Sequence, residues 1–164
     1  MIIYSIIITV LLFAAIVVAI YTSCQIKRLM KICSNEIVRY KINSEVLNQW
    51  LFAEIDGRCL ESYFINRGIS TIAVYGVNEL ARRLLDKLRQ SEKVEVKYFI
   101  DKRGKEILAP VPVYTLDELK NDYVSRTDLL VVSLVSIYDE IKESLVQETD
   151  IPIISLETIV YELQ

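Results

Sequence analysis

Ile72-Ala73-Val74-Tyr75-Gly76-Val77-Asn78-Glu79-Leu80-Ala81 is the stretch that decides the fold. A short apolar run ends in glycine, and leucines at helical spacing follow at once: Leu80, Leu84, Leu85 and Leu88. This pattern predicts a strand, a tight turn and a helix, which form the first half of a βαβ unit. Such a turn places backbone N–H groups at a helix N-terminus, where phosphate or carboxylate can bind.

Strand and helix patterns alternate through the rest of the chain. The apolar run Leu129–Leu134 is typical of a parallel strand that is buried on both faces. Thr115 and Glu118 have the spacing of a capping box at the start of a short helix. We expect an α/β fold with a Rossmann-like parallel sheet and flanking helices in residues 57–164. The expected strands are 72–75, 94–100, 109–114, 129–134 and 151–154, and the expected helices are 78–90, 116–120, 136–147 and 156–163.

The N-terminal segment is apolar and uncharged from Ile2 to Ile20, which is long enough to cross a bilayer. A signal peptide is the alternative, but no basic side chain precedes the apolar run, and Tyr21–Cys24 makes a poor lipobox. We therefore expect residues 1–23 to form a single transmembrane helix, with residues 2–22 in the membrane. The nearby Lys and Arg residues all follow this segment, which predicts an outside N-terminus and a cytoplasmic C-terminal domain at the inner or plasma membrane.

Residues 24–56 are expected to form a basic amphipathic helical connector, because no Gly or Pro interrupts residues 1–56. Apolar or tolerated residues recur there at alternating steps of four and three, which is a heptad seam. One interpretation is a short parallel coiled coil that makes a homodimer through residues 26–51. The other is a connector whose apolar stripe packs on its own domain. The seam consists of Ile26, Met30, Cys33, Ile37, Tyr40, Ser44, Leu47 and Leu51.

Composition excludes several kinds of function. The chain has no histidine and only three cysteines, without a Cys-x-x-Cys pair, so no zinc set can be assembled and no metal site is expected. The net charge is −3, but it is unevenly distributed: residues 24–41 carry five basic side chains and one acid, whereas residues 42–164 carry 14 basic and 21 acidic side chains. The acidic remainder is therefore a poor partner for nucleic acid. No Gly-x-Ser-x-Gly elbow, Walker A loop or Cys–His pair is present, so we assign no catalytic residue. Enzymatic activity is left open but disfavoured.

The first turn departs from the Gly-x-Gly-x-x-Gly fingerprint of dinucleotide folds. Gly76 supplies the first glycine and Ala81 replaces the third, but Asn78 stands where the backbone should be bare for a pyrophosphate. Glu79 adds a carboxylate at the positive end of the helix. Both features disfavour NAD or NADP. Asp101 ends the next β-rich run, where it can bind a ribose hydroxyl or cap the following turn.

Two further residues are expected near this turn, at the carboxyl edge of the sheet. Ser136 and Tyr138 follow the fourth strand together with Ser133, and ligands of open α/β sheets bind in that crevice. Ser136 and Tyr138 are therefore candidates for ligand binding. Capping of the following helix is the alternative for Ser136. Trp50, the lone tryptophan, is interpreted as a packing anchor.

Three segments carry a family resemblance: Ile72–Gly76, Val96–Lys102 and Pro112–Leu119. They resemble the Rossmann-like nucleotide-binding domain of bacterial surface-polysaccharide biosynthesis proteins. Similar domains precede the catalytic parts of membrane nucleotide-sugar dehydratases and polyprenyl-phosphate sugar-phosphate transferases, and others begin sugar acyltransferases. The resemblance implies a nucleotide-sugar near the first turn, with Gly76, Asn78 and Asp101 as the matching residues.

The expected function follows from the resemblance together with the missing catalytic motifs. It is a membrane-anchored accessory or scaffold protein of cell-envelope polysaccharide or glycan synthesis that binds a nucleotide or nucleotide-sugar, with a glycosyltransferase or another glycan-synthesis protein as partner. One alternative is an interaction protein that binds no ligand and recruits a membrane partner. The other is a small enzyme that modifies nucleotide-sugars.

Overall fold

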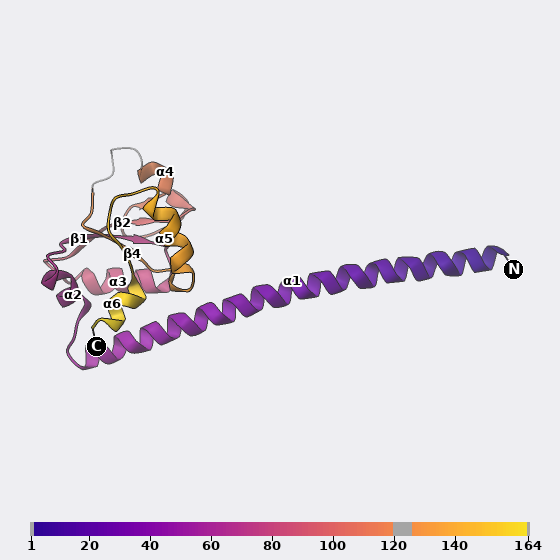
Figure 1. Cartoon of the computed structure of the whole chain (residues 1–164), viewed down its shortest axis with the longest axis horizontal. Coiled ribbons are helices and arrows are strands. Elements are labelled where there is room, and N and C mark those ends of the chain that lie inside the picture. Colours follow the sequence, from indigo (N-terminus) through magenta and orange to yellow (C-terminus); the bar gives the residue numbers. More distant parts are fainter. Residues whose placement is uncertain (1, 120–125, 164) are drawn as a thin grey trace. The chain divides into compact units, whose positions relative to one another are not determined.

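The computed structural model describes residues 2–119 and 126–163, without the side chains of residues 2, 3, 5–12 and 14. The chain divides into two compact units, Met1–Lys41 and Ile42–Gln164. The long helix α1 (Ile2–Ile55), drawn in indigo to magenta in Figure 1, belongs to both. Its continuity agrees with the absence of Gly and Pro from residues 1–56.

No helix in the described part of the chain is both long enough and apolar enough to cross a membrane. Most side chains of the segment expected to do so, namely those of residues 1–3, 5–12 and 14, lie outside the described ones. The transmembrane helix therefore stays a prediction.

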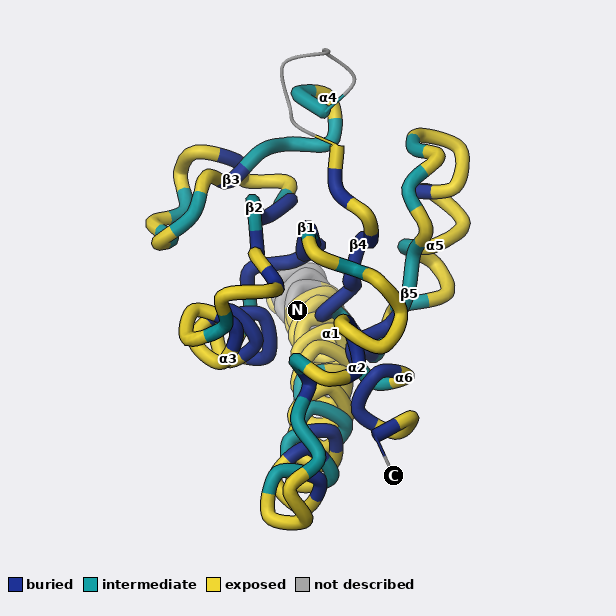
Figure 2. Tube along the Cα trace, turned by 90° about the vertical axis from the view of Figure 1, so that its left-hand side faces the viewer, coloured by how far each residue is buried: buried dark blue, intermediate teal, exposed yellow. Residues whose placement is uncertain are grey.

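The described residues of the second unit form a sheet of five parallel strands in the order β3-β2-β1-β4-β5. Figure 2 shows this order from left to right. It is a doubly wound, Rossmann-like order in which the chain reverses direction across the sheet at β1, so the predicted α/β class is confirmed. The strands are β1 (Thr71–Tyr75), β2 (Glu95–Ile100), β3 (Val113–Tyr114), β4 (Leu129–Val132) and β5 (Ile153–Ser155).

Helices cover both faces of the sheet. Successive side chains of a strand point to opposite sides, so both faces carry apolar side chains that must be buried. In β1, Ile72 and Val74 join one buried cluster, whereas Ala73 and Tyr75 join the other. The first cluster includes residues of the end of α1, of α2 (Leu60–Asn66), of α3 (Glu79–Leu88) and of α6 (Leu156–Tyr161). The second includes residues of α4 (Leu116–Leu119) and α5 (Tyr138–Val146).

The last turns of α1 are part of the domain core. Val46, Trp50 and Ala53 are buried in the first cluster, and the Trp50 indole N–H donates to Glu54 at 3.2 Å. Trp50 is therefore the packing anchor that the sequence predicts. This end of α1 therefore packs on its own domain through residues beside the seam; of the seam residues expected here, Leu47 packs partly against the core and Leu51 is 58% exposed. Neither interpretation of the connector is decided by these contacts.

Several element ends differ from the predicted ones for local reasons. The expected strand 109–114 is reduced to Val113–Tyr114, because Pro110 and Pro112 cannot donate ladder hydrogen bonds. The expected strand 129–134 stops at Val132, and the chain passes through the short 3₁₀ turn η2 (Val135–Ile137) before α5. A second 3₁₀ turn, η1 (Gly104–Glu106), follows β2.

The helix expected at 116–120 is also seen, although Lys120 lies outside the described residues. The predicted capping box precedes it. The Glu118 carboxylate accepts from the Thr115 N–H at 2.8 Å, and the Glu118 N–H donates to the Thr115 hydroxyl at 3.4 Å.

Asp128 links the segment before β4 to the start of β1 by hydrogen bonds. Its Oδ2 accepts from the backbone N–H groups of Ser70 and Thr71, at 3.0 and 2.8 Å, and from both hydroxyls. These bonds, led by that of the Ser70 N–H, lower the pKa of Asp128 from 3.8 to about 2. The carboxylate is therefore ionised at every pH at which the protein is ordinarily handled.

Asp128 should make stability depend on acid. Its folded-state pKa is depressed, so its contribution is fully present above about pH 4 and is lost as the pH falls towards 2. The side chain is exposed and screened, so we expect about 1 kcal/mol. Urea denaturation at pH 5 and pH 2.5 should show a smaller drop for Asp128→Asn than for wild type. Asp86→Asn, a change at an exposed carboxylate of α3, is the control. Equal drops in all three proteins would contradict the assignment.

Candidate functional site

The site is built on the turn that joins β1 to α3. Gly76 has a φ of +89°, a left-handed conformation that favours glycine. Its N–H donates to Ile100 O at 2.8 Å, which ties the turn to the end of β2. The Ser133 hydroxyl donates to the carbonyl oxygens of Tyr75 and Gly76, each at 3.0 Å, which ties it to the end of β4. The turn is thus held from both neighbouring strands.

Asn78 is the N-cap of α3 and has extended backbone dihedrals, φ −116° and ψ −174°. Its Oδ1 accepts from the Ala81 N–H at 2.9 Å, and its Nδ2 donates to Ser133 O at 2.9 Å. The side chain thus takes up one helix N–H group that a phosphate could otherwise use. Glu79, expected to compete with a phosphate, instead pairs with Arg83 at 2.9 Å.

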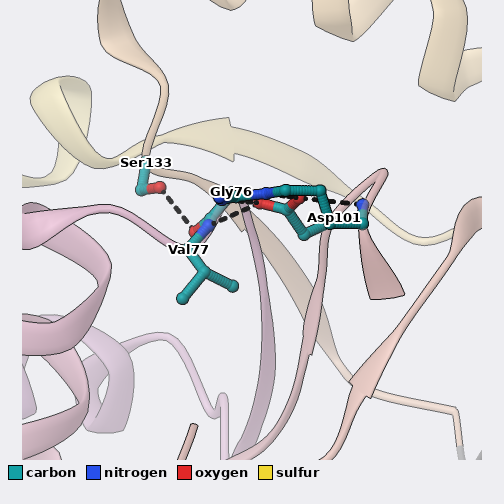
Figure 3. Close-up of polar contacts among 5 residues, drawn as sticks. Gly76, Val77, Asp101 and Ser133 are labelled. Carbon is teal, nitrogen blue, oxygen red and sulfur yellow. Dashed lines mark hydrogen bonds and ion pairs between the residues drawn. The ribbon is translucent and has the colours of Figure 1, made fainter. Parts of the chain in front are cut away.

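Asp101 is the carboxylate that reaches the turn, as Figure 3 shows. Its Oδ2 accepts from the Val77 N–H at 3.1 Å, and its Oδ1 accepts from the N–H and the Nε–H of Arg103, each at 3.1 Å. Burial acts to raise the pKa of Asp101, but the bonds from Arg103 and Val77 outweigh it and lower the pKa below its usual value. Asp101 is therefore an ionised cap of two turns, which agrees with the capping interpretation of this residue. Whether it also binds a ribose stays a prediction.

The roles of two residues near Asp101, namely Arg103 and Tyr75, were not predicted from the sequence. Arg103 pairs with Asp101 from an exposed position, and its spacing of two residues from the acid is the signal that could have found it. Tyr75 belongs to the second buried cluster and lies near enough to Asp101 for its charge to act on the phenol. Burial and then the Asp101 charge raise the pKa of the Tyr75 phenol, so it stays protonated.

Ser136 and Tyr138 are placed differently from Asn78 and Asp101. Ser136 lies in η2, whereas the N-cap of α5 is Ile137, without a side-chain cap, so the predicted capping role of Ser136 is wrong. Tyr138 donates its hydroxyl to Ile153 O of β5 at 3.4 Å. β5 is two strands away from β1, so this hydroxyl is held away from the turn. The structure gathers Gly76, Asn78, Asp101 and Ser133, and it does not bring Tyr138 to them.

The site offers hydrogen-bonding groups rather than metal ligands. In the described part of the chain, no group of three His, Cys, Asp or Glu side chains could hold a metal ion. Two hollows in this unit lie away from the turn. One, of about 370 Å³, is lined by Ser70, Thr71 and Glu95 at the amino ends of β1 and β2. The other lies between α1 and α3.

Comparison with known proteins shows a structural likeness to a solved structure. No family model matches the chain, and no curated protein matches it. Among solved structures, the chain is similar to the crystal structure of UDP-D-quinovosamine 4-dehydrogenase from Vibrio fischeri. The identity is 18% and the TM-score 0.45, and the alignment covers 53% of this chain and 77% of that one.

Proposed function

We propose that the chain is a non-catalytic, membrane-anchored Rossmann-like module that binds a nucleotide-sugar weakly at the carboxyl edge of its sheet. It serves as an accessory or scaffold protein in cell-envelope polysaccharide or glycan synthesis. The observation that carries the proposal is the position of Asp101. Its carboxylate lies at the end of β2, one hydrogen bond from the first turn, where this fold places the acid that binds a ribose.

The same geometry argues against a tightly held dinucleotide. The Asn78 amide takes the Ala81 N–H, and the Asp101 carboxylate takes the Val77 N–H. A pyrophosphate at this turn would have to replace one of these bonds. Arg103 is more easily displaced, because it is exposed, and a ribose hydroxyl could take its place on Asp101.

The second candidate is an interaction protein that binds no ligand and recruits a membrane partner such as a glycosyltransferase. It is favoured because side chains of the chain itself already form hydrogen bonds with the backbone groups of the first turn. Asp101, Asn78 and Ser133 each direct a side-chain hydrogen bond to backbone groups of residues 75–81. A turn closed in this way keeps its shape without a ligand.

Melting of the full chain in detergent with UDP-sugars decides between the two candidates. A ligand at ten times its Kd adds about 1.4 kcal/mol to the free energy of unfolding, so even millimolar binding raises the Tm. Asp101→Asn keeps an acceptor for the Val77 N–H but removes the charge, and it should abolish the shift. Asp86→Asn, the same change at an exposed carboxylate about two turns along α3 from Asn78, should leave the shift intact. If no UDP-sugar shifts wild type, the interaction protein takes first place.

Asn78→Gly should have two opposing effects. The free protein should lose up to about 1 kcal/mol, because the cap on the Ala81 N–H and the bond to Ser133 O are both removed. The UDP-sugar shift should grow, since the helix N-terminus becomes open to an anion. A smaller shift in Asn78→Gly than in wild type would mean that asparagine is itself a ligand.

The membrane anchor is part of the proposal and rests on the uncharged segment 2–22 and the basic residues after it. A reporter that is active only in the cytoplasm, fused after Gln164, should be active. A periplasmic reporter at the same site serves as the control and should be silent. The reverse pattern would overturn the cytoplasmic placement of the α/β domain. It would also contradict the proposed ligand, because the domain would not meet nucleotide-sugars of the cytoplasm.

A further inference from the structure

An apolar stripe runs along the part of α1 that belongs to the first unit. Ile26, Met30, Ile37 and Tyr40 have exposed fractions of 56%, 67%, 67% and 70%. They follow the alternating four-and-three spacing, with Cys33, also exposed, completing the series. Exposed apolar side chains at this spacing form the a and d positions of a two-stranded coiled coil.

A groove that lies wholly in the second unit is lined by the next apolar residues of this spacing. Leu47 and Leu51, the next apolar seam positions, line a hollow of about 540 Å³ together with Trp50 and Glu54 of α1. Its other wall consists of four residues of α3: Arg83, Asp86, Lys87 and Gln90. The domain core covers the side of α1 that carries Val46, Trp50 and Ala53, and Leu47 packs partly against it, whereas Leu51 is 58% exposed and open to a partner.

We infer that a second copy of this chain occupies both features. The two α1 helices pair in parallel along Ile26–Leu51, and the partner helix seats against Leu47 and Leu51 in the groove beside α3. The parallel direction rests on the proposed function, because two chains anchored by the same segment enter the membrane side by side. The dimer thus presents two α/β domains on the same side of the membrane.

Charge and spacing favour a second copy over other occupants. In the heptad fixed by this seam, Glu36 and Lys41 take the g and e positions, which face each other between parallel chains. Glu36 also pairs with Arg39 of its own helix. A helix that lies on a lipid surface needs only a 3.6-residue period, whereas steps of four and three match the 3.5-residue repeat of a helix partner.

The cysteines of the chain provide the experiment. Cys33 is a seam residue, whereas Cys24, nine residues earlier, lies about two and a half turns away on the opposite side of α1. A disulfide needs Cα atoms within about 7 Å. Mild copper-phenanthroline oxidation of the full chain in nanodiscs, with Cys59 changed to serine, should give a cross-linked dimer. Cys33→Ser should abolish the dimer band, and Cys24→Ser should not.

A matched pair of variants tests the seam without cysteine chemistry. Ile37→Glu places like charges in the seam and should raise the dimer Kd at least about tenfold, measured as mass in detergent by light scattering. Val38→Glu makes the same change one residue outside the seam and should leave the dimer intact. A monomeric wild type, or cross-linking through Cys24, would overturn the pairing. A UDP-sugar melting shift that persists in such a monomer would leave the proposed function standing.

Discussion

Gly76→Ala should lower the free energy of unfolding by about 3 to 5 kcal/mol, a large part of the total stability of an ordinary domain. Two costs combine. The φ of +89° is strained for any residue with a side chain, and an added Cβ would lie 2.7 Å from Leu134 Cγ and 3.0 Å from Ser133 Oγ. The side chains would have to move away from a turn that Ser133 itself holds in place.

Gly68 provides the control for this experiment. It has a φ of +70°, but nothing lies within 4 Å of an added Cβ, so Gly68→Ala should cost only the backbone strain of about 1 to 2 kcal/mol. Urea denaturation of both variants, followed by circular dichroism, measures the difference. Equal losses would mean that the residues after β4 do not pack against the first turn.

Trp50→Ala should cost about 3 to 5 kcal/mol, the usual range for deleting a buried aromatic side chain. Only 7% of Trp50 is exposed, and it lies in the larger core cluster with residues of α2, α3 and α6. The cavity left behind would loosen the attachment of α1 to the domain.

Phe52→Ala is the matched change on the same helix. Phe52 is 62% exposed, so its removal should change the stability by no more than about 0.5 kcal/mol. Trp50→Phe should fall between the two, since it keeps much of the apolar area and loses the bond to Glu54. Comparable losses at positions 50 and 52 would contradict the burial of this end of α1.

The sheet could be predicted from the sequence because its inner strands carry their own signal. Residues 72–75 and 129–132 are unbroken apolar runs, and all of them are buried, as central parallel strands must be. The helix after Gly76 could also be predicted, since its leucines fall on one face and all are buried. The edge strand β3 was predicted less accurately, because prolines interrupt its sequence and only two of its residues pair with β2.

The contacts of the site could be predicted only in part, because they depend on distant residues. Asn78 was predicted to block a phosphate, but its bond to Ser133 O spans 55 positions and no local pattern encodes it. Asp101 could be placed at the end of a strand, but its bond to the Val77 N–H depends on how the two turns meet. Ser136 was misjudged because a 3₁₀ turn shifts the start of α5 beyond it.

The contact between α2 and α6 has a consequence for how the protein is made. Tyr63 and Phe64 of α2 share a core cluster with Ile159 and Val160 of α6, and Arg67 pairs with Glu162 at 2.7 Å. These partners are about 95 positions apart, so the ribosome must release α6 before the core can close. Until then the apolar residues of the nascent chain stay exposed to solvent, where chaperones can bind them and proteases can cleave the chain. Stalling or proteolysis before α6 should therefore remove the whole domain rather than shorten it.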